Sequence, residues 1–142
     1  MQNGIEHALD FFAIYKKAAW EKDVDSMISL YHDEVVVFDM WGGKGFSPGI
    51  KEWSETITDW LTSLKDERVR VSFDMIDIQE SHEVAFASAL IRYQALAPDN
   101  TVLRGMRNRI TLGFIRSNGS WKVKHQHTSA PVGADLKATL TI

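Results

Sequence analysis

Residues 65–78, KDERVRVSFDMIDI, mark the point in the chain where the apolar residues change their spacing. Up to Leu64 apolar side chains recur every three or four residues, as on one face of a helix. Over 69–73 they alternate with polar residues, which is typical of a half-buried strand. The alternation slips at 75–76 and predicts a β-bulge in a long strand. The chain therefore divides into a mainly helical first half and a second half of strands.

Three helices and one strand are predicted before this boundary. Residues 5–21 form an amphipathic pattern, and Asp23 or Asp25 is a suitable N-cap for a short second helix. The β-branched run at 35–38 predicts a strand. The pair 47–48 is Ser-Pro and predicts the start of a third helix, with the serine as N-cap and the proline at the first helical position. The apolar stripe of this helix consists of Ile50, Trp53, Ile57, Trp60, Leu61 and Leu64.

Further strands are predicted at 82–96, 102–116 and 120–130, with turns at 98–100 and 117–119. Long antiparallel strands must bury one face, and the helices are the apolar cover that the chain offers. We therefore predict an α+β fold in which a curved, mixed but mainly antiparallel sheet wraps over three N-terminal helices as a cone. The expected organisation is one domain over 1–142, with its core at about 5–130 and a tail at 131–142.

Composition and charge exclude several classes of protein. The chain has 142 residues, of which 44% are hydrophobic and 25% are charged, as is usual for a globular domain. Its formal net charge of -3 argues against nucleic acid and anionic membranes as partners. It has no cysteine, which excludes disulfides and thiolate chemistry. Residues 1–10 lack the apolar region of a signal peptide and no apolar run approaches ~20 residues, so we expect a cytoplasmic protein without a membrane span.

Several strings resemble the nuclear transport factor 2-like superfamily, and in particular its SnoaL-like and ketosteroid isomerase-like members. They are DVD at 23–25, YHDEVVVFD at 31–39, RIT at 109–111 and GSWKVKHQHTSAP at 119–131. The last two are similar to the Arg-x-Thr … Gly-x-Trp-x-x-x-His-x-His-x-Ser signature of SnoaL-like domains, and also to the association domain of calcium/calmodulin-dependent kinase. The resemblance covers residues 5–130 and implies the cystatin-like or nuclear transport factor 2-like roll. It does not fix the chemistry, because one scaffold hosts isomerases, cyclases, dehydratases and non-catalytic modules.

Asp39 is the first candidate for catalysis. It shares a strand face with Val35 and Val37 and so points toward the core or its mouth, where a carboxylate can serve as a general base. The resemblance implies the same role, and it matches Tyr15 to the oxyanion-donating tyrosine of the isomerases. The simpler interpretations are an Asp that caps the following turn and a helix tyrosine with its hydroxyl at the surface. The isomerases also use a protonated carboxylic acid, but the matching position here is Thr111, which argues against steroid isomerisation.

Arg109 and two histidines complete the polar candidates. Arg109 needs a carboxylate partner, and this is either an anionic substrate group or, in a buried ion pair, Asp39 or a carboxylate of a helix. His125 and His127 alternate with lysines and share a face with Trp121, so we expect them on the helix-covered side. There His127 would help Tyr15 to stabilise an oxyanion and His125 would bind substrate, or both would brace the sheet. A His-x-His pair without a third ligand is a weak zinc signal, so no metal and no other cofactor is expected.

Aromatic residues are the remaining candidates for substrate binding. Trp53 and Trp60 lie seven residues apart on one face of the third helix, and Trp41 follows the first strand. Tyr93, on the strand 82–96, is included with them. Packing in the core explains such residues, and so does the wall of a pocket for a planar apolar ligand.

Two classes of function follow from these residues. The first is a cofactor-independent isomerase, cyclase or dehydratase that moves protons next to a carbonyl, with a small apolar or carboxylate-bearing substrate. Asp39 would be its base and Arg109 would orient the substrate. The second is a non-catalytic ligand-binding or dimerisation module, in which Asp39 neutralises Arg109 or the cone is collapsed. We expect a homodimer, as in most relatives.

Overall fold

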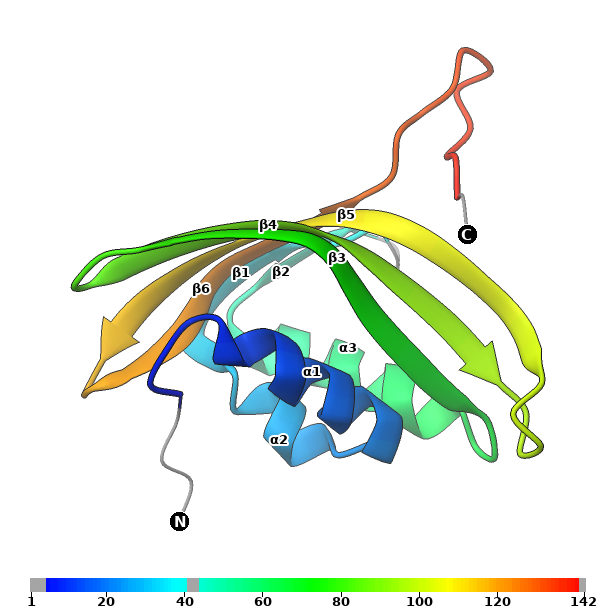
Figure 1. Ribbon diagram of the computed structural model, residues 1–142, viewed down its shortest axis with the longest axis horizontal. Coiled ribbons are helices and arrows are strands. Elements are labelled where there is room, and N and C mark those ends of the chain that lie inside the picture. Colours follow the sequence, from blue (N-terminus) through cyan, green and yellow to red (C-terminus); the bar gives the residue numbers. More distant parts are fainter. Residues whose placement is uncertain (1–4, 41–43, 141–142) are drawn as a thin grey trace.

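The computed structural model describes residues 5–40 and 44–140 and contains three helices below a curved six-stranded sheet (Figure 1). The helices are α1 (Asp10–Glu21), α2 (Val24–Ile28) and α3 (Ile50–Ser63). The strands are β1 (Tyr31–Phe38), β2 (Phe46–Pro48), β3 (Arg68–Glu80), β4 (Val84–Leu96), β5 (Val102–Ser117) and β6 (Ser120–Ser129).

The strands form one mixed sheet in the order β2-β1-β6-β5-β4-β3. β1 runs parallel to β6, whereas the other neighbours are antiparallel. The sheet arches over the helices without closing into a barrel (Figure 1). The predicted α+β architecture is therefore confirmed.

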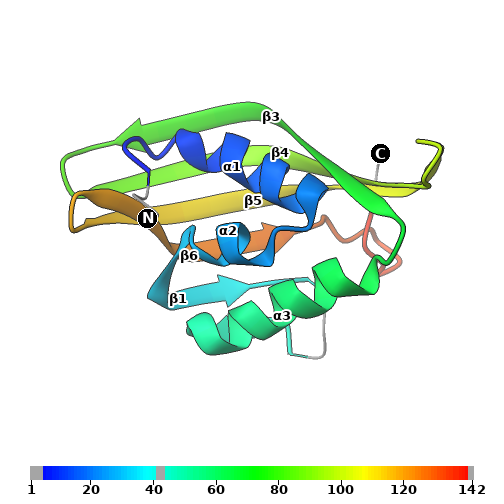
Figure 2. The same ribbon diagram turned by 90° about the horizontal axis from the view of Figure 1, so that it is seen from below.

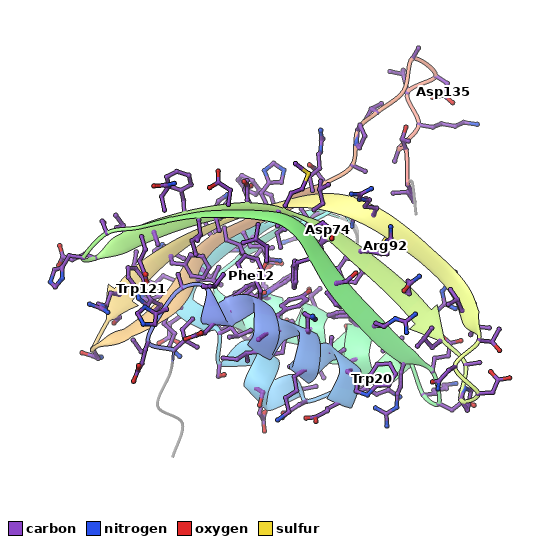
Figure 3. The ribbon with its side chains drawn as sticks, viewed as in Figure 1. Phe12, Trp20, Asp74, Arg92, Trp121 and Asp135 are labelled. Atoms are coloured by element: carbon purple, nitrogen blue, oxygen red, sulfur yellow. The ribbon has the colours of Figure 1, made fainter. Side chains whose placement is uncertain are left out.

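The concave face of the sheet and the helices bury the core between them. Seen from below, α1 lies under the β3 side of the sheet and α3 lies beside β1 (Figure 2). Phe11, Ile57, Leu61 and Trp121 are among the side chains that are almost completely buried in this layer. Phe12 points from α1 toward the sheet (Figure 3) and meets the ring of Phe73 at a centroid distance of 4.8 Å.

Two element boundaries differ from the sequence prediction. The first helix starts at Asp10 rather than near residue 5, because the backbone of Ile5 pairs with Trp121 of β6 and holds the chain extended there. The Ser-Pro pair at 47–48 belongs to β2 and pairs with Val36 and Val37, and α3 begins only after Gly49. Gly49 has φ 106°, a conformation that favours glycine, so it provides the change of direction from strand to helix.

The predicted cap and bulge are confirmed. The side chain of Asp23 accepts a hydrogen bond from the Ser26 backbone N–H at 3.1 Å and caps α2. In β3 the register with β4 shifts between Asp74 and Asp77, and Met75 within this interval has φ 54°. None of the helices in the described parts of the chain has the length and apolar character that a membrane span needs.

After β6 the chain leaves the sheet. Residues 131–140 fold back on themselves through a bridge between Val132 and Ala138, and Asp135 lies in this projecting segment, far from the helices (Figure 3). Leu140 returns to the wall of the internal cavity described below.

Candidate functional site

A cavity of about 450 Å³ lies between the concave face of the sheet and the helices. Helix α3 contributes Trp53 and Trp60 to its wall, and α1 contributes Tyr15. Helix α3 also contributes Thr56 and Ser63, and the other polar groups come from the strands and from the end of β1. A volume of this size is typical of pockets for small organic molecules, which are mostly apolar with a few placed polar groups.

Asp39 enters the cavity from the end of β1. Because side chains alternate along a strand, Asp39 follows the buried Val35 and Val37 onto the concave face. Its Oδ1 accepts hydrogen bonds from Thr128 Oγ1 at 3.1 Å and from the Met40 backbone N–H at 2.9 Å. The Asp39 N–H donates to the Gly45 carbonyl at 2.8 Å, so the carboxylate is half-buried and held in one orientation.

All three tyrosines of the chain line the same cavity. The hydroxyls of Tyr15 and Tyr93 lie 3.1 Å apart and share one hydrogen bond. Tyr31 donates to Gln126 Oε1 at 2.6 Å. Burial raises the pKa of Tyr15 well above its ordinary value, and the nearby Tyr93 and Asp39 raise it further. Burial is also the main cause of the raised pKa of Tyr31 and of Tyr93, so these phenols keep their protons.

Asn108 is a polar residue in the cavity wall that the sequence analysis did not single out. It projects from β5, is 2% exposed, and its Oδ1 has no hydrogen-bond partner among the described residues. An unpaired buried amide oxygen costs free energy, which a ligand donor can recover. Thr111, the position matched to the acid of the isomerases, lies instead on the exposed outer face of the sheet.

The raised tyrosine pKa values predict a loss of stability at alkaline pH. Unfolded tyrosines release their protons near pH 10, whereas the folded chain retains them, so the free energy of unfolding is expected to fall above about pH 10. Each such phenol contributes a slope of about 1.4 kcal/mol per pH unit. Urea unfolding at pH 8 to 11 measures this slope. Tyr31→Phe is expected to reduce the slope by the contribution of one phenol. Equal slopes in the two proteins would contradict the prediction.

The structure brings five of the predicted site residues into the cavity wall and leaves three outside it. Those inside are Asp39, Tyr15, Trp53, Trp60 and Tyr93. Arg109, His125 and His127 lie on the outer face of the sheet, so their predicted placement in the pocket is wrong. Trp41 is outside the described residues.

A β-bulge in β6 explains the position of the histidines. Gly113 pairs with His125 but Phe114 pairs with Val123, so Lys124 is an extra residue in the ladder. This extra residue reverses the alternation. Trp121 and Val123 are buried before it and Gln126 and Thr128 after it. His125 then bonds the Val36 carbonyl through Nδ1 at 2.8 Å, and His127 is exposed.

Arg109 is outside because its strand neighbours Asn108 and Ile110 are inside. Its Nε donates to Ser129 Oγ at 3.2 Å, and it makes no ion pair with Asp39 in the described structure. Alternation with the apolar Ile110 and Leu112 is the signal that places Asn108 inward and Arg109 outward. The homodimer expected from the sequence stays a prediction.

The cavity therefore presents one carboxylate, the guanidinium of Arg104, a set of neutral O–H groups and two amides within aromatic walls. Such a set can bind a molecule with a carbonyl and exchange protons with it. Among the described residues, no group of three or more His, Asp and Glu side chains could hold a metal ion.

Comparison with known proteins agrees with this architecture. One similar structure is an NTF2-like protein of unknown function from Pseudomonas putida, with a TM-score of 0.81 and 21% identity over 94% of this chain and 92% of that chain. Aln2 from a Streptomyces species gives a TM-score of 0.74 at 11% identity, covering 85% of each chain. ActVI-ORFA from Streptomyces coelicolor gives 0.73 at 10% identity, covering 85% of this chain and 92% of that one. At these identities the structures show the shared fold alone.

A comparison with curated proteins found no match. The model of the SnoaL-like domain matches residues 8–133, which span both the helices and the whole sheet. This match includes the helices and strands that line the cavity, from Tyr15 on α1 to Thr128 on β6, whereas Leu140 of the wall lies beyond it. The chain belongs to the SnoaL-like domain family.

Proposed function

We propose that this protein is a cofactor-independent enzyme of isomerase, cyclase or dehydratase type that moves a proton next to a carbonyl group. The observation that carries the proposal is the joint position of Asp39, the Tyr15–Tyr93 hydroxyl pair and Asn108 in one aromatic cavity. A base and hydrogen-bond donors must both reach the substrate for this reaction, and here they come from separate elements of the fold.

Asp39 acts as the base. Its carboxylate removes a proton from the carbon next to the substrate carbonyl, and the electron pair of the broken C–H bond moves to the carbonyl oxygen as an enolate. The hydrogen bonds from Thr128 and the Met40 N–H hold the carboxylate in place for this transfer. The proton then returns to a different carbon in an isomerisation, or to a departing hydroxyl in a dehydration. In a cyclisation the enolate carbon attacks a second carbonyl, and the new alkoxide takes the proton.

The tyrosine pair and Asn108 stabilise the enolate oxygen. One hydrogen of the Tyr15–Tyr93 pair serves the bond between them, and the other hydroxyl hydrogen is available to an acceptor. Their raised pKa values keep both phenols neutral at physiological pH, so that they can donate. Asn108 on β5 lines the same cavity, and its amide Nδ2 can also donate to this oxygen, whereas its unpaired Oδ1 can accept from a donor of the ligand. His127 and Arg109 take no part in this scheme because both lie on the outer face.

Exchange of α-protons for deuterium tests the proposal without knowledge of the natural substrate. The protein is incubated with 2-tetralone in D₂O, and loss of the α-proton signals is followed by NMR. We expect exchange well above the rate in buffer alone. Exchange at the buffer rate, together with a rise of the melting temperature by the same ketone, would favour the ligand-binding module instead.

A further inference from the structure

The two charged groups of the cavity wall lie at different depths. Among the described lining residues, Asp39 and Arg104 are the ones that carry charge. The side chain of Arg104 is 62% exposed, so it lies at the open end of the cavity, whereas Asn108 on the same strand is 2% exposed. Arg104, Met106 and Asn108 all face the cavity from β5, and the four-residue step from Arg104 to Asn108 corresponds to about 13 Å of extended strand.

Arg104 already forms an ion pair with a carboxylate of the protein, and the carboxylate of a ligand can replace this partner. Its Nη2 donates to Glu67 Oε1 at 2.7 Å, and this bond lowers the pKa of Glu67. An ion pair that is open to solvent contributes little to stability because water and salt screen it. The guanidinium has five N–H donors, so it can turn to a second carboxylate or bind one beside Glu67.

Aromatic and apolar side chains lie between these two ends. The ring of Trp60 lies 5.9 Å from that of Tyr93 and 6.5 Å from that of Tyr15, and Leu64 and Met106 also line the cavity. This wall suits a flat, apolar ring system. Asp39 repels a second negative charge at the inner end, so an acidic ligand is oriented with its uncharged end inward.

We propose that the ligand of this cavity is a cyclic ketone that carries a carboxylate, and that Arg104 binds this carboxylate at the open end. The ring system occupies the aromatic section, and the carbonyl reaches Tyr15, Tyr93 and Asn108. Arg104 is thus a specificity-determining residue, in the role that the sequence assigned to Arg109. The inference rests on the proposed function only where it identifies the inner end of the ligand as a ketone carbonyl.

Binding of a matched pair of probes tests the role of Arg104. The probes are 2-tetralone with a butanoate chain on its aromatic ring and the methyl ester of the same compound, titrated calorimetrically at low salt. The wild-type protein is expected to bind the acid about tenfold more tightly than the ester. Arg104→Gln is expected to remove this preference. Glu67→Gln is expected to increase it severalfold, because it removes the competing carboxylate.

Arg109→Gln is the control, since it removes the same charge from the outer face and is expected to leave the preference unchanged. Equal affinities for the two probes in the wild type, or a preference that survives Arg104→Gln, would overturn the inference. The titrations are repeated with Asp39→Asn, which does not need to be active to bind. The Asp39→Asn protein is expected to keep the preference for the acid. In the wild type, a preference for the acid without any deuterium exchange would refute the proposed reaction while supporting the role of Arg104.

Discussion

The Asp39→Asn protein is expected to exchange the α-protons of 2-tetralone at least about 100-fold more slowly than the wild type. Asparagine keeps an oxygen that can accept the hydrogen bonds from Thr128 and the Met40 N–H, so the local structure is retained. It has no basic oxygen, however, and cannot take up the proton. Rates are measured by NMR in D₂O at equal protein concentration.

Two measurements separate this effect from a loss of structure. Asp59→Asn makes the same chemical change on an exposed position of α3 and is expected to leave the exchange rate unchanged. The melting temperature of the Asp39→Asn protein is expected to stay close to that of the wild type, because the asparagine oxygen keeps the hydrogen bonds from Thr128 and the Met40 N–H. If the Asp39→Asn protein exchanges protons as fast as the wild type, Asp39 is not the base.

Phe11→Ala is expected to lower the free energy of unfolding by about 3–5 kcal/mol. Phe11 is fully buried, and its ring lies within 5.4–6.4 Å of the rings of Phe12, Tyr15, Tyr31 and Phe114. It therefore joins α1 to β1 and β5 and supports two of the cavity tyrosines. Urea unfolding followed by circular dichroism measures the change.

The matched control is Phe86→Ala, which removes the same atoms from a position that is 60% exposed and is expected to change stability by no more than about 0.5 kcal/mol. Small domains have total free energies of unfolding of only about 5–15 kcal/mol, so the loss in Phe11→Ala can prevent folding. Phe11→Leu is therefore the second variant. It keeps most of the volume, and a loss of about 1.5 kcal/mol or less is expected. Similar losses at positions 11 and 86 would show that Phe11 is not the centre of the core.

The parts of the site on regular elements could be predicted from local periodicity. Asp39 continues the alternation of Val35 and Val37, Trp53 and Trp60 repeat on one face of a regular helix, and all three line the cavity. The same rule applied to β5 would have found Asn108, which lies two residues before the buried Ile110. The resemblance matches Thr111 to the acid of the isomerases, but Thr111 lies between the buried Ile110 and Leu112 and therefore faces outward.

Other parts depend on pairing between distant segments and could not be predicted in this way. The Ser-Pro pair at 47–48 has the local signature of a helix start, but Val36 and Val37 bind it as an edge strand. The bulge at Lys124 arises from the register between β5 and β6, which the sequence of β6 alone does not specify. The association of Tyr31 with Gln126 likewise joins residues that are far apart in the chain.

The bulge at Lys124 determines which chemical groups the interior contains. Gln126 and Thr128 do not titrate near neutral pH, and they face inward because one additional residue precedes them. A relative that kept all of these residues but paired β5 with β6 without the bulge would turn both imidazoles inward, and its interior would gain or lose protons between about pH 5 and 8. A change in the pairing register of two strands can thus change which titratable side chains face the interior of the same fold, without replacing a single amino acid.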